Sequence, residues 1–233
     1  MKTFRKSASR QAHPIGAGLV FCLSISLLQA TTLRPMNLQE IVQRSSRIFT
    51  GECLSASEGV DSRGIPYSLY TFRILEQVKG RFEGVTVTIK QFGIRSRSGR
   101  SSMGGRLTRI DGMPDYLPGA TYTLFLNNES RLGFSAPIGL LQGAFRVLGK
   151  DSGQRVVNGI SNRNLLLDTS KTAAQRLAQS RQTLRSRTPN AGEALQGTVA
   201  YSAFMATVQR MTRGETISLA EVGRSLRAGG GTR

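Results

Sequence analysis

The stretch Ile65–Phe92, IPYSLYTFRILEQVKGRFEGVTVTIKQF, decides the fold because it has the pattern of two β-strands joined by a short turn. In its second half Val85, Val87 and Ile89 alternate with polar residues, a period of two that is typical of a strand with one apolar face. The residues expected to share the apolar face of the first half are Tyr70, Phe72, Ile74 and Val78, with Glu76 interrupting the row. A hairpin alone is only marginally stable in water, so other segments must cover this face.

Length and composition bound the rest of the protein. The 233 residues suit one domain of ordinary size with a targeting segment and a tail, and 39% hydrophobic residues allow a real core. The formal net charge is +18, from 32 Lys and Arg against 14 Asp and Glu. Such a charge favours anionic partners or surfaces, although it does not determine the fold.

The first thirty residues have the pattern of a secretory signal. Their apolar run, residues 15–28, is too short for an ordinary membrane span. It follows a positive start without an acid, made by Lys2, Arg5, Lys6 and Arg10. We expect cleavage near Ala30 and a secreted or periplasmic protein with no transmembrane span in the mature chain; an uncleaved anchor is the alternative. The mature chain would lose His13, the sole histidine, and keep one cysteine, Cys53.

Three parts follow from this pattern: a signal peptide at 1–30, a β domain at 31–160, and a basic helical tail at 161–233. We predict that the tail is partly disordered and loosely attached, although residues 199–211 have the pattern of an amphipathic helix. A short helix should start after Asn37, because Asn37 and Glu40 form a capping box.

Outside the central hairpin we expect a strand at residues 47–54, a strand in which Tyr122, Leu124 and Leu126 share a face, and a second hairpin within 145–157. Residues 55–64 are predicted to be a polar loop.

Several short motifs resemble a family of uncharacterised secreted bacterial proteins, over about residues 31–160. The motifs are Thr31-Thr32-Leu33-Arg34-x-Met36, Gly-x-x-x-Ser at 51–55, Thr71-Phe72-Arg73, Val78-Lys79-Gly80, Gly112-Met113-Pro114 and Gly139-Leu140-x-Gln142-Gly143-x-Phe145-Arg146-Val147.

The order of elements is also similar to the netrin-like module of tissue metalloproteinase inhibitors. This similarity implies a small OB-like antiparallel barrel with a short N-terminal helix. The chain lacks the cysteines that staple such modules, and Thr31 cannot chelate zinc as their N-terminal cysteine does. Inhibition is therefore not carried over, and a netrin-like interaction or protease-inhibitor-like module remains an alternative function.

The composition argues against catalysis. Without histidine the mature chain has no Ser-His or Cys-His nucleophile and almost no means of building an imidazole zinc site. No glycine-rich phosphate loop has the required strand-to-helix setting. We predict a non-enzymatic protein without catalytic residues, cofactor or metal. A carboxylate-dependent hydrolase built on Asp111 and Asp115 is the remaining enzymatic alternative, although turn capping and ion pairs explain these acids more simply.

The clearest candidate site is the stretch from Gly93 to Ile110, which carries five arginines and no acid. The candidate polyanion-binding residues are Arg95, Arg97, Arg100, Arg106 and Arg109. Guanidinium groups suit phosphates and acidic or sulfated sugars, whereas a solvated insertion is the simpler alternative. No aromatic residue lies between Phe92 and Tyr116, which disfavours sequence-specific nucleic-acid binding. We expect an anionic polysaccharide, lipid head groups or an envelope protein as the partner.

Overall fold

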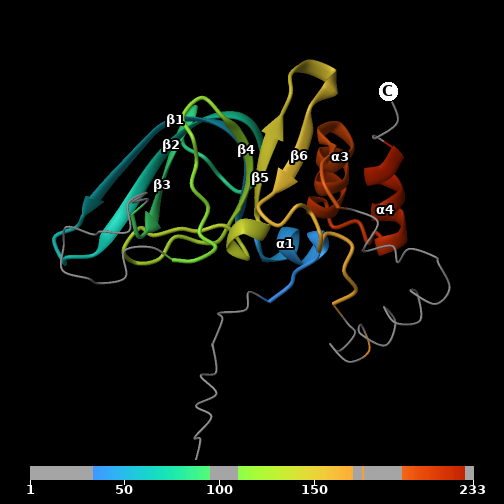
Figure 1. The fold of residues 1–233 in the computed structure, drawn as a ribbon, viewed down its shortest axis with the longest axis horizontal. Coiled ribbons are helices and arrows are strands. Elements are labelled where there is room, and N and C mark those ends of the chain that lie inside the picture. Colours follow the sequence, from blue (N-terminus) through green and yellow to red (C-terminus); the bar gives the residue numbers. More distant parts are fainter. Residues whose placement is uncertain (1–33, 95–109, 170–174, 176–195, 229–233) are drawn as a thin grey trace, which may run out of the picture. The chain divides into compact units, whose positions relative to one another are not determined.

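The computed structural model describes residues 34–94, 110–169, 175 and 196–228, which are built around one antiparallel sheet (Figure 1). The strand order is β3-β2-β1-β4-β5-β6-β7. The strands are β1 Arg47–Val60, β2 Pro66–Lys79, β3 Thr86–Phe92, β4 Thr121–Leu126, β5 Ala144–Leu148, β6 Arg155–Asn158 and β7 Val199–Ala200. The helices are α1 Leu38–Arg44, α3 Tyr201–Thr212 and α4 Leu219–Ala228, with short 3-10 turns at Leu140–Gln142 and Asp151–Gly153. The prediction of a mainly β protein with an N-terminal helix and a helical C-terminal part is confirmed.

The central hairpin is confirmed, but the strand before it is longer than predicted. β2 pairs with β3 from Tyr67–Phe92 to Arg73–Thr86. β1 continues through the predicted polar loop to Val60, where it still pairs with β2. Backbone pairing with β2 overrides the polar composition of this segment, and the turn that remains is closed by Asp61, whose carboxylate accepts the N–H of Ile65 at 3.0 Å.

A β-bulge in β2 changes the faces predicted for its last residues. Thr50 pairs with Glu76 and Gly51 with Ile74, which leaves Leu75 as the extra residue. After the bulge, Glu76 and Val78 lie on the opposite face from the residues before it. The prediction that Val78 shares a face with Tyr70 is therefore wrong.

The two faces of the sheet carry two separate cores. On one face the helices cover a cluster that we call the helix-side core, which includes Leu38, Ile41, Ile48, Phe125, Phe145, Val156, Phe204, Val208, Val222 and Leu226. The other face carries the aromatic core, which includes Phe49, Cys53, Tyr70, Phe72, Ile89, Tyr116, Tyr122 and Leu124. The alternation along β4 explains this division, because Leu124 and Leu126 point into the aromatic core and Phe125 into the helix-side core.

The sheet is not closed, so the predicted OB-like or netrin-like barrel is not confirmed. Its order runs from β3 at one end to β7 at the other. Among the described residues, the outer edge of β3 makes only one isolated bridge, between Lys90 and Phe134. The segment that contains Phe134 makes a second isolated bridge, between Pro137 and Leu126 of β4. Closure of a barrel requires a continuous ladder between end strands, and two single bridges do not supply one.

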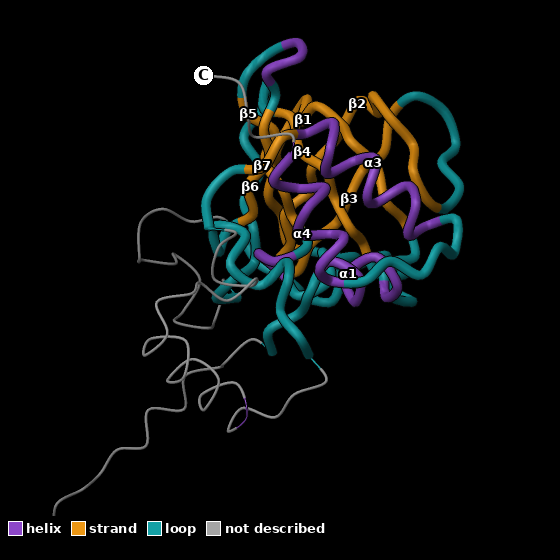
Figure 2. The backbone as a smooth tube through the Cα atoms, turned by 90° about the vertical axis from the view of Figure 1, so that its right-hand side faces the viewer, coloured by secondary structure: helices purple, strands orange, loops and turns teal. Residues whose placement is uncertain are grey.

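The C-terminal helices pack on the sheet rather than forming a loosely attached tail. α3 and α4 lie over the helix-covered face (Figure 2). Phe204 of α3 is fully buried, with its ring centroid 4.7 Å from that of Phe145 and 6.1 Å from that of Phe125. β7 joins the sheet through β6. The sequence did not indicate this packing, because each helix buries only a narrow stripe of apolar side chains. None of the described helices is long and apolar enough to cross a membrane.

Candidate functional site

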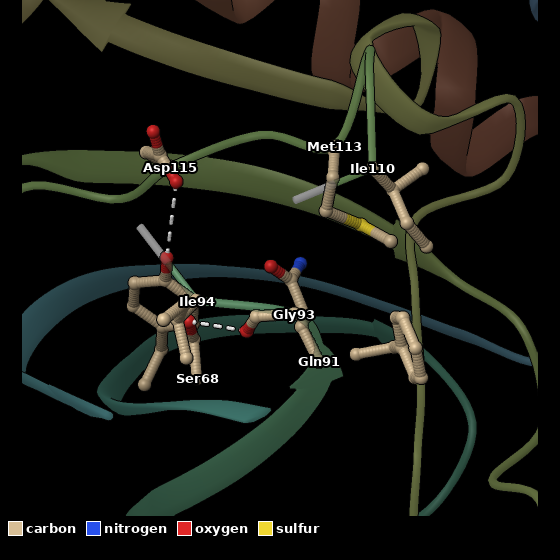
Figure 3. Close-up of a pocket in the computed structure, with 9 residues that line it drawn as sticks. Ser68, Gln91, Gly93, Ile94, Ile110, Met113 and Asp115 are labelled. Atoms are coloured by element: carbon tan, nitrogen blue, oxygen red, sulfur yellow. Dashed lines mark hydrogen bonds between the residues drawn. The ribbon is translucent and has the colours of Figure 1, made fainter. Parts of the chain in front are cut away.

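The five candidate arginines lie outside the described residues, but the residues that flank them, Ile94 and Ile110, are described. Ile94 and Ile110 line the same small cavity, together with Ser68, Tyr70, Gln91, Phe92, Gly93, Met113 and Asp115 (Figure 3). The last described residue before the arginines and the first one after them therefore lie close together. The cavity measures about 10 Å³, the size of a single water molecule, so it is a packing seam and not a ligand pocket.

Hydrogen bonds hold both ends of this segment to the sheet. The Ser68 hydroxyl donates to the carbonyl of Gly93 at 2.8 Å, and the Gly93 N–H donates to the carbonyl of Pro66 at 2.9 Å. On the returning side, the Tyr70 hydroxyl donates to the Asp115 carboxylate at 3.4 Å (Figure 3). The described residues on both sides of the arginine segment are therefore held to β2.

Tyr116 closes the aromatic core just after this base, a role that no sequence pattern indicated. Its fully buried ring lies edge-on to the rings of Tyr70, Phe72 and Tyr122, with centroids 4.8, 5.2 and 5.0 Å away. Burial raises the pKa of the Tyr116 phenol well above its ordinary value, and the hydrogen bond from Gln91 at 3.2 Å opposes this shift. Tyr116 is therefore neutral near pH 7 and serves as a packing residue.

A shallow groove of about 270 Å³ is lined by Tyr116 and its neighbours. Its floor is a row across three strands, because Tyr122, Arg146 and Val157 are register neighbours on β4, β5 and β6. Its walls are the segment 114–117 and the pair Leu141 and Gly159. Arg146 is exposed, and no hydrogen bond or ion pair with another described residue holds its guanidinium. The groove thus combines a mainly apolar lining with the guanidinium of Arg146 and the carboxylate of Asp115.

The motifs that carry the family resemblance meet in space. The Gly112 carbonyl accepts the N–H of Leu141 at 3.0 Å, which joins the Gly-Met-Pro motif to the Gly-Leu-x-Gln-Gly motif. Gln142 is buried, accepts the N–H of Met36 at 2.9 Å and donates to the carbonyl of Arg34 at 3.0 Å. These motif residues therefore hold the N-terminal segment against the sheet, which is a structural role.

Next to Gln142, the chain requires a glycine at position 143. A Cβ at Gly143 would lie 2.3 Å from the carbonyl oxygen of Ile138, a backbone atom that cannot rotate away. The Gly143 carbonyl in turn accepts the N–H of Phe125 at 3.0 Å, so the close approach belongs to the sheet itself.

Asp111 and Asp115 are the two acids of the enzymatic alternative, and both are exposed. Asp111 lies exposed in a turn, and Asp115 lies exposed beside the cavity, where it accepts the hydrogen bond from Tyr70. Cys53 is buried in the aromatic core, as expected for a small hydrophobic residue, with its thiol 3.5 Å from the carbonyl of Ser55. Among the described residues, no group of three or more His, Cys, Asp or Glu is placed to hold a metal ion.

A polar cluster on the helix-covered face was also missed by sequence reasoning. Glu76 accepts hydrogen bonds from the Tyr201 hydroxyl and the Gln209 amide of α3, both at 2.8 Å. The Tyr201 oxygen also lies 3.1 Å from the hydroxyl of Thr50. The pKa of Tyr201 is raised to about 12, mainly by burial and also by the hydrogen bond to Glu76, while the hydrogen bond to Thr50 opposes the shift. The signal in the sequence was Glu76 itself, an acid within an apolar row.

Charge is divided unevenly along the chain. The described residues contain 17 basic and 13 acidic side chains, whereas the whole chain contains 32 and 14. The remaining residues therefore carry 15 basic side chains and one acid, Glu193. The described residues are close to neutral, and most of the positive charge lies in residues outside the described ranges.

Comparisons of the chain with protein-family models, with curated proteins and with solved structures found no match.

Proposed function

We propose that this protein is an exported, non-enzymatic binding module that contacts anionic polymers through the arginines between Ile94 and Ile110. The observation that carries the proposal is the division of charge. Five arginines without an acid occupy residues 95–109, while the described body holds nearly balanced charges. A basic segment on a nearly neutral body concentrates positive charge locally, and residues 170–195 carry five further basic side chains that would compete for the same partner.

The base of the segment supports this proposal. Because Ile94 and Ile110 line one cavity and hydrogen bonds fix Gly93 and Asp115, the described residues on both sides of the arginines are held on one support. A support of this kind lowers the conformational entropy that a bound segment loses. Guanidinium groups pair bidentately with phosphate, carboxylate and sulfate oxygens, so the ligand class is a polymer or surface with repeated anionic groups.

Retention on immobilised heparin, a sulfated polysaccharide, tests the proposal. The variant Arg95→Ser/Arg97→Ser/Arg100→Ser should elute at clearly lower salt than the wild type, because it loses three contacts of the binding segment. The matched control, Arg63→Ser/Arg131→Ser/Arg163→Ser, loses the same charge at exposed positions on the folded body. The control should elute close to the wild type.

Two outcomes would contradict the proposal. Equal elution of both triple variants would show that only net charge matters. Unchanged elution of the segment variant would show that these arginines only keep a solvated insertion soluble.

A protein-interaction module is the second candidate, and the groove beside Tyr116 favours it. A mainly apolar lining that carries the guanidinium of Arg146 and the carboxylate of Asp115 suits a peptide segment with apolar side chains and a charge of each sign. Binding there should change little with salt, since burial of apolar surface would dominate. Salt-insensitive capture of an envelope protein that Arg146→Ala weakens would support this candidate over the first.

A further inference from the structure

The face of β5 and β6 that the helices do not cover carries two neighbouring arginines. Arg146 pairs with Val157 across the two strands, and Leu148 pairs with Arg155. The two pairs lie on one face, because their positions differ by two on each strand. Arg146 is also the register neighbour of Tyr122, which belongs to the aromatic core, so this face is the one opposite the helix-side core. The two arginines are therefore diagonal neighbours, with Cβ atoms about 7 Å apart.

No acid among the described residues pairs with either arginine. Other arginines of the same ranges are neutralised, as in the ion pair of Arg47 with Glu129. The Arg155 side chain is held by Thr198 instead: its Nε donates to the hydroxyl at 2.6 Å and its Nη2 to the carbonyl at 2.8 Å. Both acceptors are uncharged, so the Arg155 guanidinium is fixed in place and keeps its full charge. A guanidinium that is already fixed loses less conformational entropy when an anion binds.

This face is connected to the residues that flank the arginine segment. Asp115 lines the small cavity together with Ile94 and Ile110, and it also lines the groove together with Arg146. The groove therefore extends from the flanks of the segment to the two arginines. Asp115 accepts the hydrogen bond from Tyr70 and does not form an ion pair with Arg146. One long anionic polymer that contacts the segment can thus continue to this face.

We propose that Arg146 and Arg155 together bind one anionic group of a polysaccharide. The inference rests on the proposed function and adds a second binding site for the same polymer, built from described residues. Two guanidinium groups on neighbouring strands can both reach one sulfate or carboxylate group. A polysaccharide fits this face better than a lipid surface, because Leu148 and Val157 are only half-exposed and β5 and β6 present no exposed large apolar side chain to a bilayer.

The binding of heparin by the full chain over a salt series tests the inference. Arg146→Ser should bind more weakly, and its plot of log binding constant against log salt concentration should lose about one unit of slope, since one ionic contact is lost. Arg155→Ser should act in the same direction. The losses should not add in the double variant, because both arginines hold the same group. The matched control is Arg224→Ser, which removes one exposed cation from α4 on the helix-covered side and should bind like the wild type.

Arg146→Ser keeps the test decisive if Arg155→Ser fails to fold. Arg155→Ser removes both bonds to Thr198, whereas the guanidinium of Arg146 makes no hydrogen bond to another described residue. Equal heparin binding by Arg146→Ser and Arg224→Ser would overturn the inference, and strictly additive losses would overturn the shared group. Weaker binding of Arg146→Ser to phosphatidylglycerol vesicles, with unchanged heparin binding, would assign the face to lipid and also overturn it.

The variant Arg95→Ser/Arg97→Ser/Arg100→Ser separates this inference from the proposed function. In that background, adding Arg146→Ser should weaken the remaining heparin binding further. If the triple variant alone binds like the wild type while Arg146→Ser binds more weakly, the proposed function of the segment is wrong and the site on β5 and β6 stands. If the triple variant binds weakly and Arg146→Ser changes nothing in either background, the segment stands and this inference is overturned.

Discussion

The Tyr201 hydroxyl at the start of α3 donates a 2.8 Å hydrogen bond to the Glu76 carboxylate, which the bulge at Leu75 turns toward the helix. This contact joins residues 125 positions apart and ties the C-terminal helices to the central hairpin. The bulge in β2 thus places the acid to which α3 is bonded. The sequence pattern predicts this helix as part of a loosely attached tail.

Tyr201→Phe should lower the free energy of unfolding by about 1–2 kcal/mol, because a hydrogen bond to a charged group is lost in a half-buried setting. Chemical denaturation measures this loss. Tyr67→Phe is the control, since no hydrogen bond to another described residue holds the Tyr67 hydroxyl. Equal stability of both variants and the wild type would mean that Tyr201 does not anchor α3.

The same contact predicts a pH dependence. The pKa of Tyr201 is raised from 10.0 to about 12 in the folded protein, so the folded state binds more protons than the unfolded state between these values. The stabilising contribution is therefore complete below pH 10 and is lost as pH rises toward 12. The stability difference between the wild type and Tyr201→Phe should shrink across this range in denaturation curves. A difference that stays constant would contradict the assignment.

Phe204→Ala should destabilise the whole domain by about 3–5 kcal/mol, because the ring is fully buried between Phe125 and Phe145. Ser202→Ala, on the exposed side of the same helix, should change stability by less than about 0.5 kcal/mol. Thermal unfolding followed by near-ultraviolet circular dichroism would report the effect on the sheet. If Phe204→Ala left the melting temperature unchanged, the helices would be independent of the sheet.

Gly143→Ala should cost at least about 2 kcal/mol, because the new Cβ would lie 2.3 Å from the Ile138 carbonyl oxygen. Gly153→Ala offers a matched control in the nearby hairpin, since no atom lies within 4 Å of a Cβ there. Its stability should stay within about 0.5 kcal/mol of the wild type. Similar denaturation midpoints for the two variants would show that position 143 tolerates a side chain.

The sequence predicted those parts of the fold that depend on local periodicity. The hairpin of β2 and β3, the capped helix after Asn37 and the second hairpin all have a pattern of their own, and each is present. Features that depend on a partner strand were missed. The polar residues after Leu54 form a strand only because β2 pairs with them, and the bulge at Leu75 is visible only in the register with β1.

Sheet closure and the candidate site were harder to predict, for related reasons. Whether end strands meet depends on the curvature of the whole sheet, so similarity in the order of elements could not establish a barrel. Tyr116 is a single aromatic residue in a turn-rich segment, and no periodicity marks it as the residue that closes the aromatic core. The arginine run can be read directly from the sequence. The proximity of Ile94 and Ile110 depends on tertiary structure, and no sequence pattern indicates it.

The dependence of polyanion affinity on salt tests the central claim most directly. For the wild type, the logarithm of the binding constant for heparin should fall linearly with the logarithm of salt concentration, since each ionic contact releases condensed counterions. Arg95→Ser/Arg97→Ser/Arg100→Ser should weaken binding and reduce this slope by up to about 3, roughly one for each lost contact. Arg63→Ser/Arg131→Ser/Arg163→Ser should leave the slope unchanged. If the two triple variants gave the same slope, the segment between Ile94 and Ile110 would not be the binding site.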